Sequence, residues 1–286
     1  MRPIKDILTE EYWNIAFREV EENEYIFKNK NQSFNSLKES KRYWYADPFL
    51  FEHKNDVWLF VEAFDNVKEK GLIACMKYEG GKFSEPRIVL EEAFHLSYPF
   101  IFEENGEIFM MPETSEAECI QLYKAVDFPY VWEHHTVLSE TKDAVDTVLF
   151  NNKLIVSVVT NPFEKRADVD VYDLNGNIVH KGLHKNSQTA RGAGRIFIAD
   201  DKILRPAQDS TGSVYGAGLR FYHFDDTDEN ISEKEVYSLA ADEFDVNGVI
   251  PDGVHTYART DSLEIIDYKR KRFNLRRILW ILRKKL

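Results

Sequence analysis

A unit of about 50 residues recurs along the chain and constrains its fold more than any other feature. In the first copy, residues 43–62, an Asp-Pro pair is followed by an apolar run, a polar turn, a second apolar run and a glutamate. The same plan returns in residues 97–113, 145–160 and 193–206, and in a more degenerate form in residues 248–267. Short apolar runs bounded by turn residues are typical of paired antiparallel strands.

The spacing of the units selects one kind of all-β architecture. The heads of the first four units are 51, 48 and 48 residues apart and lie at Asp47, Tyr98, Asp146 and Gly194. A repeat of this length that contains strand pairs indicates a β-propeller, in which each unit forms one blade around a central channel. A β-sandwich would not explain the regular spacing of these heads. The sequence therefore predicts a single-domain, five-bladed β-propeller over residues 1–268, whose last blade is completed by the N-terminal segment.

Composition excludes several classes of protein. No apolar run reaches the ~18 residues that span a bilayer, and the N-terminus has no apolar segment of the kind found in secretory signals. Cys75 and Cys119 both lie in apolar runs, which predicts free thiols in a reducing, cytoplasmic compartment. The chain has 49 acidic and 37 basic residues, a net charge of −12, so nucleic acid is not expected as a partner.

The C-terminal segment differs from the rest of the chain in charge. Residues 269–286 contain nine Lys or Arg and no acid, which leaves residues 1–268 with a net charge of −21. On a helical projection of residues 269–286, leucine and isoleucine share one face and basic residues lie opposite. This pattern predicts a short amphipathic helix on a membrane surface with anionic lipid, and hence a peripheral location on the inner membrane face. The alternatives are a helix packed on the acidic propeller and a partner-binding tail.

The repeat also predicts where chemistry takes place. The innermost strands of a propeller surround its channel, so the heads of different blades should converge. Carboxylates collected in this way suit sugar chemistry, because one can deprotonate a nucleophile while another protonates a leaving oxygen. The candidate catalytic residues are Asp47, Glu113 and Asp146. The candidate substrate-binding residues are polar or aromatic side chains at or near the heads: Trp44, Glu62, Tyr98, Arg191, Arg195, Arg205, Gln208, Asp209 and His255.

Each candidate also has a structural interpretation. Asp47 can cap the turn before the proline that follows it, and His255 can be a satisfied structural histidine. Arg191 and Arg195 can pair with channel carboxylates, or their guanidinium forks can hold a phosphate. The histidines show no metal-ligand spacing, and the sequence contains no P-loop or dinucleotide fingerprint. No metal or cofactor is therefore predicted.

The motifs YADPFLFE, SYPFIFEENGEIFMMPET, LYKAVDFPYVWE, GAGR, LRPAQD, YGAGL and GVHTY together resemble a known family. This family comprises the N-terminal propeller domain of plant glucosamine inositolphosphorylceramide transferase and related bacterial proteins, and it is similar to the propellers of family-43 glycoside hydrolases. The resemblance implies that Asp47 is the general base and that Asp146 orients and tunes the acid. In the hydrolases the acid is a glutamate that heads a later blade, where this sequence has Arg191 and Arg195.

That departure favours a phosphorylated ligand over simple hydrolysis. We therefore expect a glycosyltransferase of surface polysaccharide or glycolipid biosynthesis, with a sugar nucleotide, sugar phosphate or glycan as substrate. Arg191, Arg195 and Arg205 would bind the phosphate, and Asp146 and Glu113 would position the sugar or act as the acid. The alternatives are a glycoside hydrolase of the family-43-like type and a non-catalytic glycan-binding propeller.

Overall fold

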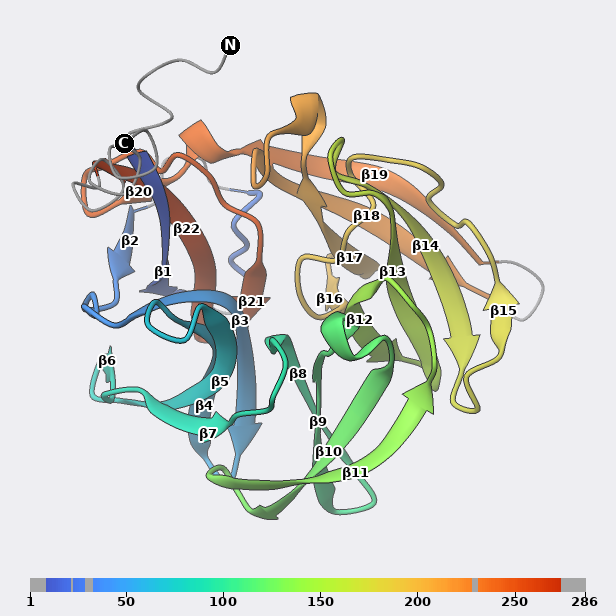
Figure 1. The fold of residues 1–286 in the computed structure, drawn as a ribbon. Helices are drawn as coiled ribbons and strands as arrows, with labels where there is room; N and C mark the ends of the chain where they lie inside the picture. Colours follow the sequence, from blue (N-terminus) through green and yellow to red (C-terminus); the bar gives the residue numbers. More distant parts are fainter. Residues whose placement is uncertain (1–8, 22, 29–32, 228–230, 274–286) are drawn as a thin grey trace, which may run out of the picture.

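The strands form five sheets arranged around a common centre (Figure 1). The computed structural model describes residues 9–21, 23–28, 33–227 and 231–273. Within these ranges the helices are single 3-10 turns, and none has the length and apolar character needed to cross a membrane. The prediction of an all-β, five-bladed propeller is confirmed.

Blades one to four each coincide with one of the sequence units. Blade one contains β3 (Tyr43–His53), β4 (Asp56–Asp65), β5 (Lys70–Glu79), β6 (Lys82–Phe83) and β7 (Arg87–Leu90). Blade two contains β8 (Ser97–Glu104), β9 (Glu107–Glu113), β10 (Ile120–Asp127) and β11 (Val131–Ser139). Blade three contains β12 (Ala144–Phe150), β13 (Lys153–Asn161), β14 (Arg166–Asp173) and β15 (Ile178–His180). Blade four contains β16 (Phe197–Ala199), β17 (Lys202–Asp209), β18 (Gly218–Asp226) and β19 (Ile231–Ala240).

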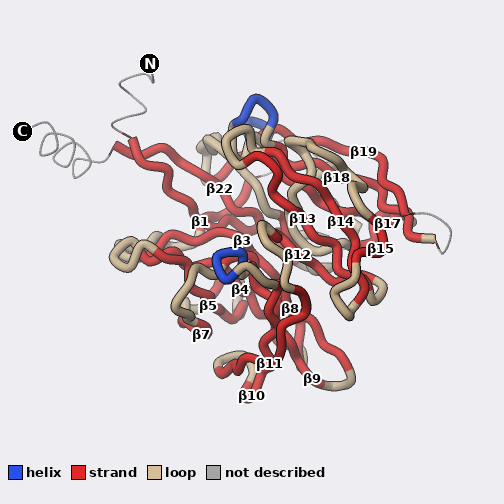
Figure 2. The backbone as a smooth tube through the Cα atoms, turned by 45° about the vertical axis from the view of Figure 1, so that its right-hand side comes forward, coloured by secondary structure: helices blue, strands red, loops and turns tan. Residues whose placement is uncertain are grey.

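Blade five joins the two ends of the chain. It contains β21 (Tyr257–Arg259), β22 (Leu263–Phe273), β1 (Thr9–Glu19), β2 (Ser33–Ser36) and β20 (Asp245–Val246). β1 and β22 are antiparallel along their whole length and run side by side in Figures 1 and 2. The N-terminal segment thus completes the last blade, as expected, and this pairing closes the ring so that neither strand is left as an open edge.

The predicted start of the C-terminal helix is wrong. Residues 269–273 belong to β22, where they pair with the first residues of β1, so the propeller extends to Phe273. The reason is that alternating tyrosine, lysine and arginine side chains can continue a strand as readily as they begin a helix. Residues 274–286, which carry the rest of the predicted amphipathic pattern, lie outside the described residues.

The heads of the units share an unusual backbone conformation. Asp47, Tyr98 and Asp146 have φ angles of 51°, 46° and 48°, and each interrupts the pairing register of the innermost strand of its blade. Gly194, the head of the fourth unit, has a φ of 133°. A non-glycine residue in the left-handed region costs on the order of 1–3 kcal/mol and persists only where its surroundings enforce it. The sequence repeat is therefore also a repeat of backbone bulges around the channel.

Candidate active site at the propeller hub

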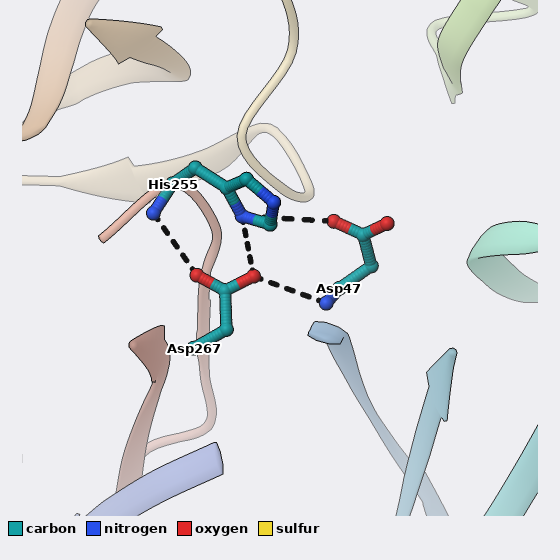
Figure 3. A group of neighbouring side chains, drawn as sticks. All are labelled: Asp47, His255 and Asp267. Carbon is teal, nitrogen blue, oxygen red and sulfur yellow. Dashed lines mark hydrogen bonds and ion pairs between the residues drawn. The ribbon is translucent and has the colours of Figure 1, made fainter. Parts of the chain in front are cut away.

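Asp47 stands on a network supplied by the last blade. The Thr256 hydroxyl donates to Asp47 Oδ1 at 2.9 Å, and His255 Nδ1 lies 3.9 Å from the same oxygen. Figure 3 shows the second oxygen of Asp47 pointing away from His255. Asp267 holds the group together: its Oδ2 accepts from the backbone N–H of Asp47 at 3.1 Å and lies 2.5 Å from His255 Nδ1, while its Oδ1 accepts from the backbone N–H groups of His255 and Thr256.

Asp47, His255 and Asp267 are the one group among the described residues whose ligand atoms lie close enough to hold a metal ion. The candidate ligand atoms of Asp47, His255 and Asp267 lie within 4.8 Å of one another, and all three residues are buried. Both oxygens of Asp267 already accept hydrogen bonds, and His255 Nδ1 faces one of them. A cation would have to displace that contact. We therefore interpret the cluster as a hydrogen-bonded support for Asp47.

Burial dominates the acidity of Asp47. The residue is 7% exposed, and desolvation raises its pKa to about 8, although His255 opposes the shift. Negative charge on Glu62, Asp267 and Asp146 raises it further. Since these carboxylates come from blades one, five and three, acids that are far apart in the chain share one electrostatic neighbourhood.

Asp146 is held as an ion pair. Nε of Arg191 donates to its Oδ2 at 2.6 Å and Nη2 donates to its Oδ1 at 2.9 Å, which is the bidentate geometry that suits a carboxylate. The Gln208 amide donates to Oδ2 at 3.4 Å and to the Gly192 carbonyl at 2.9 Å. A Cβ at Gly192 would lie 2.9 Å from the Asp146 carbonyl oxygen, so glycine lets the two blades meet. Asp146 therefore serves as a fixed negative charge.

Glu113, at the end of β9, is more accessible than Asp47, Glu62 and Asp146. Its side chain is 13% exposed, and its Oε1 accepts from the Ser115 hydroxyl at 2.8 Å. Arg191 Nη2 lies 3.7 Å from its Oε2. Desolvation and then the charge of Asp146 raise the pKa of Glu113 to about 7, against the opposing effect of Arg191. We call Asp47, Glu62, Glu113 and Asp146 the hub carboxylates.

Glu62 and His95 complete the exposed side of the hub. Nε2 of His95 lies 3.3 Å from Glu62 Oε1, and the backbone N–H of Gly71 donates to His95 Nδ1 at 3.0 Å. Desolvation opposes charge on His95, but Glu62 raises its pKa above the ordinary value, with smaller contributions from Glu113 and Asp47. Trp44, predicted to bind substrate, stacks on the neighbouring Phe64 at 4.6 Å.

Two predicted substrate-binding residues are structural. Tyr98 is fully buried; its hydroxyl accepts the backbone N–H of Gly194 at 2.7 Å and joins blades two and four, so no sugar can stack on its ring. Arg205 is 1% exposed and forms a bidentate pair with Glu233, at 2.6 and 2.8 Å. The carboxylate already occupies the guanidinium fork that was expected to hold a phosphate.

Two more predicted residues lie away from the hub carboxylates. Asp209, at the end of β17, pairs with Arg220 at 2.8 Å, and that arginine also pairs with Glu235. Arg195 lies beyond the turn at Gly194, against the Phe100 ring, with Leu50 and Arg259 as further neighbours of the same hollow. The expectation that Arg191 and Arg195 act together is wrong, because the backbone turn between them sends the two side chains to different ends of the channel.

The sequence motifs missed several residues of the hub. Asp267 is one of two buried acids in β22, with Glu264, and its place directly after two isoleucines was the one available signal. Trp13 stacks on His255 at 4.1 Å, and Tyr215 meets the same imidazole edge-on at 4.9 Å. Tyr215 also lies under the Arg191 guanidinium at 5.7 Å. Nothing in the spacing of these aromatic residues predicts that they cover the hub.

Comparison with known proteins gives the family. The family model described as "Glucosamine inositolphosphorylceramide transferase 1, N-terminal" matches residues 31–244. Curated relatives of that name from Arabidopsis thaliana and Oryza sativa subsp. japonica are each 32% identical over 192 residues. The alignments cover 61% and 62% of this chain but 25% and 26% of the relatives, so the chain spans about a quarter of their length.

Solved structures of low sequence identity share the fold. The catalytic domain of a GH62 alpha-L-arabinofuranosidase from Coprinopsis cinerea has a TM-score of 0.57 at 8% identity, and covers 89% of this chain and 97% of its own. A beta-1,2-mannobiose phosphorylase from Listeria innocua has a TM-score of 0.55 at 10% identity, with 82% and 92% covered. The family match runs through four of the five blades. The chain therefore belongs to the family of the N-terminal domain of glucosamine inositolphosphorylceramide transferase 1.

Proposed function

We propose that the protein is a carbohydrate-active enzyme that transfers a glycosyl group to a hydroxyl of a glycan or glycolipid. The named activity of the plant relatives supports a transferase, and the hub supports acid–base chemistry. The observation that carries the proposal is the convergence of the hub carboxylates, in which Arg191 pairs with Asp146 and lies 3.7 Å from Glu113. Burial there raises the pKa of Asp47 to about 8 and that of Glu113 to about 7. Perturbed carboxyls of this kind concentrate at sites of proton transfer.

In the proposed reaction, Asp47 accepts the proton of the acceptor hydroxyl as its oxygen attacks the anomeric carbon. The bond to the leaving oxygen breaks, and Glu113 gives that oxygen its proton. Asp146 pairs with Arg191, and burial followed by the charge of Asp146 raises the pKa of Glu113 to about 7, so that Glu113 carries a proton near neutral pH. Gln208 holds Asp146 in place, and Ser115 holds Glu113.

The test is turnover of a panel of sugar nucleotides and sugar phosphates with glycan and lipid-linked acceptors. Because the base has the higher pKa, the fraction of enzyme in the reactive protonation state gives a bell-shaped profile with its maximum between about pH 7 and pH 8. Asp47→Asn and Glu113→Gln should each lower kcat by about 100-fold or more. Glu133→Gln, an exposed acid on β11, is the matched control and should leave kcat unchanged.

Three outcomes would contradict the proposal. Release of free sugar with water as the sole acceptor would make the protein a hydrolase. Ligand binding that survives both hub variants, with no turnover by the wild type, would make it a glycan-binding propeller. Turnover that persists in Asp47→Asn and Glu113→Gln would place the chemistry elsewhere.

We also propose peripheral membrane binding in the cytoplasm through the basic tail. The support is the sequence of residues 274–286, which has three Arg, two Lys and no acid among leucine and isoleucine residues. This is the pattern of an interfacial segment. Flotation with vesicles containing anionic lipid should recover the full chain, and deletion of residues 274–286 should abolish recovery. Equal flotation of the two forms would reject this proposal and leave the catalytic one intact.

A further inference from the structure

Two arginines without carboxylate partners lie together at the end of the channel away from the hub carboxylates. Arg195 leads into β16 and Arg259 ends β21, and both line a hollow of about 420 Å³. The hollow lies beside the hairpins that follow the inner strands, at Glu52 and Glu103. The hub carboxylates lie at the other end of these strand pairs, toward the beginnings of the inner strands and the ends of the second strands. The backbone N–H of Tyr257 donates to the Ala193 carbonyl at 2.7 Å, so the two segments that carry the arginines are adjacent.

Neither guanidinium is neutralised by a described residue. Arg195 donates to the Ile101 carbonyl and lies 4.5 Å from the Phe100 ring centroid, and burial lowers its pKa to about 10. Arg259 lies 4.4 Å from the Tyr25 ring centroid, and its enclosed Nε and Nη2 have no hydrogen-bond partner in the part of the chain that the structure describes. A fork that is shielded from water and unpaired is costly.

Three other arginines form close pairs with carboxylates: Arg18 with Glu264, Arg191 with Asp146, and Arg205 with Glu233. Arg270 has an enclosed Nε without a partner among the described residues, but it donates to the Val246 carbonyl and does not line this hollow. Acids do line the hollow of Arg195 and Arg259, namely Glu52, Glu103 and Asp261, but they are exposed and no ion pair joins them to either arginine. The two guanidinium groups thus carry positive charge that no described carboxylate neutralises, although acids line the same hollow.

We propose that this hollow is a binding site for the phosphate group of a sugar phosphate. The guanidinium forks match phosphate oxygens, and the acids at the rim can accept hydrogen bonds from sugar hydroxyls. The volume falls in the range of small-molecule pockets, about 300–1,000 Å³. The site is separate from the hub, so it concerns a second ligand of the protein and does not depend on the proposed transfer reaction.

The test is calorimetric titration of the full chain with glucose 1-phosphate, inorganic phosphate and glucose. We expect both phosphates to bind and glucose alone not to bind, and glucose 1-phosphate to bind more tightly than inorganic phosphate. Arg195→Gln and Arg259→Gln should each weaken binding by about tenfold or more, because each removes charge-assisted hydrogen bonds. Arg87→Gln is the matched control, since its guanidinium also lies over a tyrosine ring, at 4.0 Å, but on the exposed surface.

A second readout covers loss of folding by the variants. Glucose 1-phosphate should raise the Tm of the wild type and of Asp47→Asn, whose change lies in the hub, but not that of Arg195→Gln or Arg259→Gln. Binding that is unchanged in both arginine variants would overturn the site. So would equal binding of glucose, or the absence of phosphate binding by the wild type at millimolar concentration.

Discussion

Asp47 shows how burial sets the chemistry of a single residue. Its side chain lies beside His255, and Trp13 and Tyr215 pack against that imidazole. Burial and the neighbouring carboxylates make ionisation of Asp47 costly. A carboxyl whose pKa is raised on folding binds protons more tightly in the folded state. It therefore favours folding at low pH, and that contribution is lost as the pH rises through the folded pKa.

The Asp47→Asn variant measures this effect, because asparagine does not titrate. Between about pH 4, near the unfolded pKa, and about pH 8, the stability of the variant relative to the wild type should rise by up to about 1.4 kcal/mol per pH unit. Urea unfolding at several pH values gives the slope. Asp209→Asn is the control: burial opposes ionisation of Asp209, but hydrogen bonds from Thr211 and Arg220 lower its pKa, so its relative stability should be flat from pH 5 to 8. A flat line for Asp47→Asn would show that Asp47 ionises normally.

Tyr98 supports the hub by a single hydroxyl. Tyr98→Phe keeps the ring but leaves the Gly194 N–H buried without an acceptor, which should lower the free energy of unfolding by about 1–3 kcal/mol. Tyr130→Phe is the control, since the hydroxyl of Tyr130 makes no hydrogen bond with the described residues. Unchanged stability of Tyr98→Phe in urea unfolding would refute the structural role.

The inner strands are the elements that bring the acids together. β3, β8 and β12 each have a bulge near their beginning, and in β3 and β12 the bulge turns Asp47 and Asp146 out of the regular alternation of the strand toward the hub. The positive φ of these residues is a cost that the surrounding contacts must offset.

Two substitutions at Asp146 isolate that cost. Both Asp146→Ala and Asp146→Gly lose the pair with Arg191, but only glycine adopts a φ of 48° without strain. The glycine variant should therefore be more stable than the alanine variant by about 1 kcal/mol in urea unfolding. At Glu133, on the extended strand β11, the order should reverse because glycine weakens a regular strand. If the alanine variant is the more stable one at both positions, the bulge at Asp146 carries no strain.

The strand elements also explain which parts of the account could be predicted from sequence. The heads were found because a bulge requires the same residue pattern in each blade, and that pattern recurs at a readable spacing. The sequence could not predict that the side chains of Arg191 and Arg195 lie apart, since this depends on the backbone turn at Gly194. Asp267 was missed because its role arises from pairing between the last blade and Asp47, which are 220 residues apart in the chain.

At the scale of the whole molecule, closure of the ring makes the hub. β1 pairs with β22 along its whole length, which fixes blade five beside blade one and places Asp267 and His255 under Asp47. Blades two and three then bring Glu113 and Asp146 to the same neighbourhood, where Arg191 touches both. The function proposed for the protein depends on this convergence.

The most direct test of that convergence is the titration of Glu113 by carbon-13 NMR, with its signal assigned by its absence in Glu113→Gln. We expect an apparent pKa of about 7 for Glu113 in the wild type, and a clear decrease in Asp146→Asn, because a negative charge from the next blade has been removed. A pKa near the ordinary value of about 4.3, unmoved by Asp146→Asn, would contradict it.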